Sequence, residues 1–262
     1  MLAIETFESA IVRTRRMLDL YDILCDTRQR DVRDDWAKSF KECMHWPNAE
    51  KIVRIDGKDK KSLLILRQEL AISREQFAHE YVSELLRSCI VSAVSALDRY
   101  LHDLVVERCW PLLNQPVENI PKELRNVRIP ILQGMSATER LRKDPKARPG
   151  HVFKKAVQDI LHEETFQSSR EVEKAAGMLG IKDFWGQVAS CMPSYNQKKL
   201  AKKPIIDELN RIVARRNKIV HEADIERQLK GRDVKLRDIK PAEAKIIVDW
   251  LDTFVHAIDK AK

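Results

Sequence analysis

The residues best suited to chemistry are Arg216, Asn217 and His221, which lie close together near the end of a predicted helix. The helix begins at about Pro204, and at about 100° per residue its apolar side chains form one continuous stripe. Arg216 lies in the middle of this stripe, and Asn217, His221 and Asn210 lie beside it. The group supplies a fixed cation, a neutral hydrogen-bonding amide and a side chain that titrates near neutrality. These are the parts of an anion site or of acid–base chemistry.

The arginine on the apolar stripe has three explanations. A guanidinium is always charged, so burying Arg216 without a partner would cost several kcal/mol. Its long stem can pass the end of the helix and leave the charge in water. Alternatively, it can pair with a buried acid, or it can face a cleft that binds an anion. The neighbouring amide and histidine favour the cleft, but the sequence leaves all three explanations open.

Residues 216–221 read R-N-x-x-x-H, which resembles the R-x4-6-H signature of the HEPN family (higher eukaryotes and prokaryotes nucleotide-binding). An earlier run at residues 95–104, S-A-L-D-x-x-L-H-D-L, resembles the first long helix of the RiboL-PSP-HEPN-like branch. The resemblance extends from about Ser73 to the C-terminus. HEPN domains are all-α, and many are metal-independent ribonucleases of toxin–antitoxin, CRISPR or other anti-phage systems. The resemblance therefore implies an all-α ribonuclease of that kind.

The family resemblance implies a chemistry for the motif. RNA carries its own nucleophile, the 2′-hydroxyl, so the protein need only move protons and stabilise the charge that builds on phosphorus. His221 would act as general acid or base. Arg216 would stabilise the transition state, with Asn217 as a neutral donor beside it. We expect no metal ion and no cofactor, because the sequence has no clustered-carboxylate or Cys/His metal site.

The resemblance also implies partners. One chain supplies one motif histidine, whereas acid–base cleavage uses two proton-transfer groups, and HEPN ribonucleases pair two motifs across a shared cleft. We therefore expect RNA as the substrate and a homodimer whose two-fold axis passes near His221. An antitoxin or another defence protein is a further expected partner. Some family toxins carry a tyrosine two places after the motif histidine, where a nucleotidyltransferase adds AMP. Ala223 stands at that place, which puts silencing by this route in doubt.

Several other residues are candidates for supporting roles. Asp98 and His102 are four positions apart in the earlier run and therefore share a helix face. An aspartate that orients a histidine is a catalytic arrangement, although surface Asp–His pairs are common. Asn210 lies on the polar strip of the motif helix, and Arg215 lies on its solvated arc. We expect five basic residues to contact the RNA backbone: Lys198, Lys199, Lys202, Lys203 and Arg215.

Periodicity predicts an α-helical bundle with one very long helix. No glycine or proline interrupts the apolar pattern between Ser73 and Pro111, which predicts a helix of about 35 residues. The N-terminal part is predicted to hold further helix, with a possible small β-hairpin in residues 51–66 around an Asp-Gly turn. We therefore divide the chain into an N-terminal helical and hairpin extension, 1–72, and an HEPN-like helical domain, 73–262.

Composition narrows the environment of the protein. The net charge of +8 suits a polyanionic partner, although a basic protein can also be basic for solubility alone. The five cysteines are widely spaced and form no CxxC pair, which favours free thiols in a reducing cytoplasm. We see no signal-like leader and no apolar run of about 18 residues, and so expect a cytoplasmic protein that does not enter a membrane.

A second reading of the same residues belongs to a different class of function. The chain can be a non-catalytic HEPN-like module that binds nucleotide, RNA or a protein partner, with Arg216 in a structural ion pair. The two readings predict different surroundings for the arginine. A ribonuclease needs Arg216 and His221 at a cleft, whereas the interaction module needs Arg216 sealed against an acid.

Overall fold

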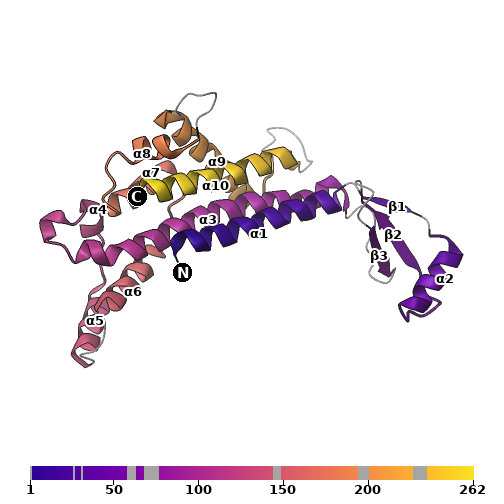
Figure 1. The fold of residues 1–262 in the computed structure, drawn as a ribbon, viewed down its shortest axis with the longest axis horizontal. Helices are drawn as coiled ribbons and strands as arrows, with labels where there is room; N and C mark the ends of the chain where they lie inside the picture. Colours follow the sequence, from indigo (N-terminus) through magenta and orange to yellow (C-terminus); the bar gives the residue numbers. More distant parts are fainter. Residues whose placement is uncertain are drawn as a thin grey trace. The chain divides into compact units, whose positions relative to one another are not determined.

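The computed structural model describes residues 2–25, 27–30, 32–57, 63–67, 77–143, 149–193, 201–226 and 235–262. Helices dominate these residues, and a small antiparallel sheet lies in the N-terminal part (Figure 1). The elements are α1 (Ala3–Leu24), β1 (Arg28–Arg30), α2 (Asp34–Cys43), β2 (Ile52–Asp56), β3 (Leu63–Arg67), α3 (His79–Leu113), the 3-10 turn η3 (Val117–Asn119), α4 (Lys122–Arg125), α5 (Ile131–Lys143), α6 (Pro149–Leu161), α7 (Ser169–Met178), α8 (Phe184–Cys191), α9 (Lys202–Glu222) and α10 (Pro241–Ala261).

The chain forms two compact units. The larger unit comprises Met1–Arg13, Ile90–Arg237 and Ile246–Lys262, and the smaller comprises Thr14–Cys89 and Asp238–Lys245. The helical class and the small hairpin predicted from the sequence are both confirmed. The boundary predicted between residues 72 and 73 lies outside the described residues and stays a prediction.

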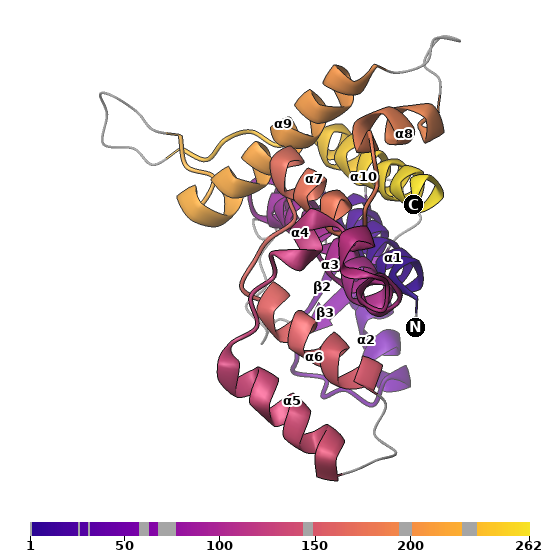
Figure 2. The same ribbon diagram turned by 90° about the vertical axis from the view of Figure 1, so that its left-hand side faces the viewer.

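Three helices form the core of the larger unit, where parts of α1, α3 and α10 lie side by side (Figure 1, Figure 2). Phe7 of α1 packs edge-on against Tyr100 of α3, with ring centroids 5.9 Å apart. The Tyr100 hydroxyl donates to Asp259 of α10 at 3.0 Å, which gives the one polar end of this buried ring a partner. Around this pair the α3 side chains are apolar, and Leu97, Leu104 and others of them have no exposed surface.

Helix α3 is the long helix that the sequence predicts. It has 35 residues and contains Pro111 in its last turn, where one missing backbone donor is tolerated. Ser73, where the predicted helix begins, lies outside the described residues. The shorter helices α7, α8 and α9 pack on one another in the same unit. Trp185 of α8 stacks on Phe254 of α10 with centroids 6.2 Å apart, which anchors this group to the core.

The smaller unit contains the sheet, whose strand order is β1-β2-β3. Strands β2 and β3 form the predicted hairpin, with Ile52 opposite Arg67 and Asp56 opposite Leu63. The sequence did not predict β1, which pairs antiparallel with β2. A strand of three residues carries almost no periodicity, so only its pairing reveals it.

Among the described residues, no helix is long and apolar enough to span a bilayer.

Candidate active site

Helix α9 carries the R-N-x-x-x-H motif in its last two turns. Its first part is buried as the stripe predicts, since Ile205, Leu209, Ile212 and Val213 have at most 7% of their surface exposed. The apolar stripe emerges from the core toward the C-terminal end, where Val220 is 45% exposed. The motif therefore lies at the point where α9 leaves the packed core.

Arg216 is half-buried and its guanidinium has a neutral partner. Its Nη1 donates to the side-chain oxygen of Asn217 at 3.1 Å. Its Nε is buried and makes no hydrogen bond to any residue that the structure describes. Within the part of the chain that the structure describes, Arg216 makes no ion pair. A cation without a counter-charge, beside the exposed side chains of Asn217 and His221, leaves capacity to bind an anion.

The buried ion pair of this helix belongs to Arg215. The prediction that Arg215 lies on the solvated arc is wrong, because only 12% of its side chain is exposed. Its two terminal nitrogens bind both carboxylate oxygens of Asp224, one of them at 3.0 Å, and Asp224 has no exposed surface. The guanidinium of Arg237 lies 4.0 Å from the same carboxylate and 3.5 Å from the carboxylate of Glu222. Pairing with a buried acid was one of the three explanations for Arg216, but it is the neighbouring Arg215 that makes such a pair.

The chain reversal after α9 explains how an acid nine positions on reaches Arg215. Ala223 and Asp224 both have left-handed backbone, with φ of 48° and 55°, which non-glycine residues seldom adopt. The N–H of Asp224 donates to the carbonyl of Lys218 at 2.9 Å and closes the end of the helix. The N–H of Arg237 then donates to the carbonyl of Asp224 at 2.8 Å. Buried charge and backbone hydrogen bonds thus hold the helix end that presents His221.

The Asp98–His102 pair forms within α3, with the histidine Nε2 3.6 Å from the carboxylate. Asp98 also accepts hydrogen bonds from the backbone N–H of Phe166 at 2.5 Å and from the side chain of Gln167 at 3.2 Å. Burial raises the pKa of Asp98, but its interactions with His102, Phe166 and Gln167 outweigh burial and hold that pKa below its ordinary value. The ring of His102 lies against Phe166 with centroids 4.6 Å apart. Asp98 therefore fixes both the histidine and the segment before α7.

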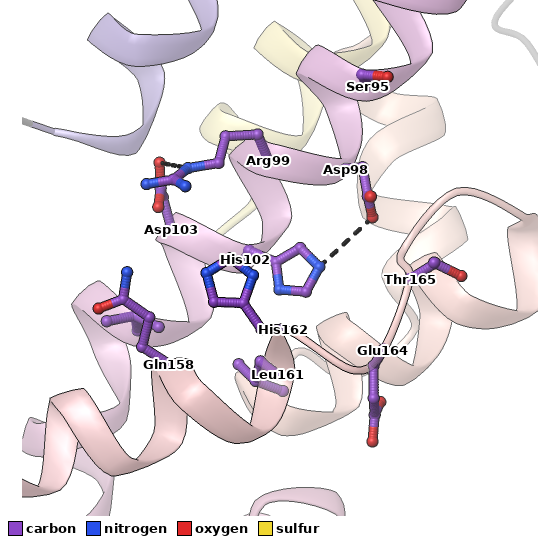
Figure 3. Close-up of a pocket in the computed structure, with 11 residues that line it drawn as sticks. Ser95, Asp98, Arg99, His102, Asp103, Gln158, Leu161, His162, Glu164 and Thr165 are labelled. Carbon is purple, nitrogen blue, oxygen red and sulfur yellow. Dashed lines mark hydrogen bonds and ion pairs between the residues drawn. The ribbon is translucent and has the colours of Figure 1, made fainter.

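A pocket of about 250 Å³ lies beside this pair (Figure 3). It lies between α3 and the end of α6, and the Asp98–His102 pair forms one wall. His162, which follows α6, lines the other side of the pocket. Sequence reasoning missed His162, because a single exposed histidine after a helix carries no signal. Only the packing of α6 against the rest of the unit brings His162 and His102 to one pocket.

Most of the chain matches one known protein family. A family model described as RiboL-PSP-HEPN matches residues 58–261. The chain belongs to the RiboL-PSP-HEPN family. No curated protein and no solved structure matches the chain.

Asn210, predicted to support the RiboL-PSP-HEPN motif, lies apart from it along α9. The side-chain oxygen of Asn210 accepts from the backbone N–H of Ser169 at 3.1 Å, at the start of α7. Asn210 thus ties two helices together about 9 Å before Arg216 and about 16 Å before His221, at 1.5 Å per residue. The structure gives Asn210 a structural contact of its own and does not bring it to the motif.

The predicted basic residues begin at the opposite end of α9. Lys198 and Lys199 lie outside the described residues. Lys202 pairs with Asp183, and Lys203 is exposed in the first turn. About 28 Å of helix separates Lys202 from His221, at 1.5 Å per residue. Any RNA that touches both therefore runs along the length of α9.

Among the described residues, no group of three or more histidine, cysteine or acidic side chains is arranged to hold a metal ion.

Proposed function

We propose that this RiboL-PSP-HEPN protein is a metal-independent endoribonuclease whose site is built from Arg216, Asn217 and His221. The observation that carries the proposal is the state of Arg216, a half-buried guanidinium that makes no ion pair among the described residues. A purely structural arginine at such a place is normally paired with an acid, as Arg215 is. The exposed imidazole of His221 one turn further on supplies a group that transfers protons near neutral pH.

The proposed reaction is a transesterification. A base removes the proton of the 2′-hydroxyl, the 2′-oxygen bonds to the adjacent phosphorus, and the bond from phosphorus to the 5′-oxygen breaks. An acid returns a proton to the departing 5′-oxygen, which leaves a 2′,3′-cyclic phosphate and a 5′-hydroxyl. Arg216 stabilises the extra negative charge on the phosphoryl oxygens, a role worth about 2.7–4 kcal/mol for one well-placed donor. His221 provides one of the two proton transfers, worth roughly 10²–10⁴ in rate.

The second proton-transfer group comes from a second chain in this proposal. Each chain carries a single motif, so a homodimer with its two-fold axis near His221 would place two motifs at one cleft. Light scattering should give the mass of two chains at a protein concentration of about ten micromolar, because an obligate interface persists at that concentration. A strictly monomeric protein that still cleaves RNA would refute the composite site and leave the nuclease intact.

The central experiment measures RNA cleavage by the purified protein in EDTA. Structured RNA should be cut into products with cyclic or 3′-phosphate ends, and DNA of the same sequence should remain intact because it lacks the nucleophile. Arg216→Ala and His221→Ala should each slow cleavage at least a hundredfold, about 2.7 kcal/mol. The double variant should be little slower than either single one, because the groups act on one step. Arg211→Ala is the matched control, since this exposed arginine lies on the same helix and pairs with Glu208.

Binding without cleavage would favour the interaction module. In that case Arg216→Ala would lower thermal stability and RNA affinity, and the wild-type protein would cut no RNA under any condition. Lys203→Ala separates binding from chemistry in the active case. It should weaken RNA binding and reduce its salt dependence by about one counterion while leaving the rate of the bound complex unchanged.

The proposed biological role is that of a toxin or defence effector held in check by a partner protein. Expression of the wild-type chain alone should arrest growth of the host cell, and His221→Ala should relieve the arrest. Ala223 stands where a tyrosine would accept AMP, so the proposed partner acts by binding and not by that modification.

A further inference from the structure

The pocket between α3 and α6 collects polar residues that the proposed motif chemistry does not use. Ser95, Asp98 and His102 all line it, and they come from the S-A-L-D-x-x-L-H-D-L run of α3 (Figure 3). Their spacing of three and four positions puts them on one face of the helix. His162 faces them from the residue after α6. The whole pocket lies within the larger compact unit.

The wall formed by Asp98 and His102 is held in place by contacts within the protein, before any ligand binds. The Nε2 of His102 lies 3.6 Å from the Asp98 carboxylate, and its ring packs against that of Phe166 at a tilt of 44°. Asp98 is itself held by the Phe166 N–H and by Gln167. Only 18% of the His102 side chain is exposed. An imidazole fixed in this way loses little rotamer entropy when a ligand binds against it.

Both walls also offer hydrogen-bonding groups that have no partner in the described part of the chain, Ser95 on α3 and the others in and after α6. Among the described residues, the side chains of Ser95, Gln158, His162 and Thr165 make no hydrogen bond or ion pair. They supply hydroxyl, amide and imidazole groups, each of which can both donate and accept. The floor between the walls includes the apolar side chains of Val106 and Leu161. A ligand that fits is therefore flat or apolar on its faces and polar at its edge.

Charge disfavours an anion inside the pocket. Three carboxylates line it, Asp98, Asp103 and Glu164, and the one cation of the lining is Arg99; Lys174, outside the lining, pairs with Glu164, so one carboxylate, Asp98, is left in excess. Arg99 is already paired with Asp103 at 2.8 Å. A phosphate group brought among these carboxylates would meet net repulsion. The uncharged part of a nucleotide does not carry this penalty.

Size limits the ligand to a small group. The volume of about 250 Å³ lies just below the roughly 300 Å³ at which pockets for drug-sized ligands begin. A nucleobase suits this volume, has aromatic faces for two imidazoles and carries donors and acceptors at its edge. Unpaired bases of RNA are recognised in this way, by stacking on aromatic rings that include histidine and by hydrogen bonds to the base edge.

We propose that this pocket binds one unpaired nucleobase of an RNA, with the sugar-phosphate outside, and so selects where the RNA is engaged. The inference rests on the proposed function for its substrate, but it can be tested without cleavage. His162 is the residue to change, because it is exposed and makes no side-chain bond among the described residues, so its loss should leave folding intact.

The first experiment uses free ribonucleosides, which require no nuclease activity. Adenosine, guanosine, cytidine and uridine are added singly at millimolar concentration to isotope-labelled protein, and the histidine ring signals are followed by NMR. At least one nucleoside should shift the ring signals of both His102 and His162 while that of His256, on α10, stays unchanged. The shifts should vanish in His162→Ala. If none of the four moves either ring, the pocket does not bind bases and the proposal fails.

The second experiment places the pocket in RNA binding. Affinity for short single-stranded RNAs that differ at one base is measured in the His221→Ala background, where cleavage is removed. Adding His162→Ala should weaken binding of the preferred RNA about tenfold, the order expected for the loss of one stacked base, and should abolish the preference. Lys155→Ala, an exposed change on α6 outside the pocket, is the control. Equal effects of the two changes would overturn the inference but leave the nuclease proposal standing.

Discussion

Replacing Asp224 tests whether a buried ion pair holds the end of the motif helix. Asp224→Asn keeps the shape of the side chain and tolerates the left-handed φ of 55° about as well as aspartate does. The substitution therefore removes the negative charge and leaves Arg215, only 12% exposed, without its carboxylate. Breaking a buried pair from one side costs about 3–5 kcal/mol. We expect the lower end, about 3 kcal/mol, because asparagine retains one hydrogen-bond acceptor for the guanidinium.

The assay is equilibrium unfolding in urea at pH 7, followed by the helical circular dichroism signal. A loss of about 3 kcal/mol at a slope of roughly 3 kcal/mol/M lowers the midpoint by about 1 M. Glu208→Gln is the control, because it removes an acid from the more exposed pair with Arg211 on the same helix. That change should alter the free energy of unfolding by less than about 0.5 kcal/mol.

A double variant separates the ion pair from other effects of the substitution. Arg215→Gln with Asp224→Asn removes both charges, so the loss should be smaller than the sum of the two single losses by at least about 1 kcal/mol. Additive losses, or a single-variant loss as small as that of the control, would refute the view that this charge pair fixes the end of α9.

Three further predictions concern other parts of the larger and smaller units. His256 is partly desolvated, but its contacts with acidic partners such as Glu8, 3.3 Å away, outweigh burial and raise its pKa above 6.5. The free energy of unfolding of the wild type should therefore exceed that of His256→Gln by the full amount below about pH 6.5, and the difference should disappear as pH rises through the higher folded pKa, as measured by urea unfolding at several pH values. Burial raises the pKa of the Cys89 thiol to about 11, so a thiol reagent at pH 8 should modify the exposed Cys43 and spare Cys89 until the protein is unfolded. Equal rates of modification of the two thiols in the folded protein would contradict the buried position of Cys89. Asn210→Ala removes the acceptor at the start of α7 and should cost about 1 kcal/mol in urea unfolding without changing RNA cleavage, and a large loss of activity would instead return Asn210 to the site.

Local patterns in the sequence were sufficient for the helices. The uninterrupted apolar repeat before Pro111 predicted the 35-residue α3, and the stripe of α9 predicted the buried side chains of its first part, though not the exposure of Val220. The β2–β3 hairpin followed from two short apolar runs close together in the sequence, although Asp56 of the predicted Asp-Gly turn lies within β2, opposite Leu63. These predictions held because helical periodicity and the pairing of adjacent strands depend on residues close together in the sequence. The position of the R-N-x-x-x-H string at a helix end is information of the same local kind.

The partners of the charged residues were decided only by the tertiary structure. Arg215 and Arg216 are adjacent in sequence, yet Arg215 is sealed against Asp224 and Arg216 makes no ion pair among the described residues. The difference arises because the chain turns back through two left-handed residues after α9, and no periodic pattern announces that turn. The pocket has the same origin, since His102 and His162 meet only where α6 packs beside α3. Periodicity determines which face of a helix is buried, but the group opposite each polar side chain depends on where distant segments return.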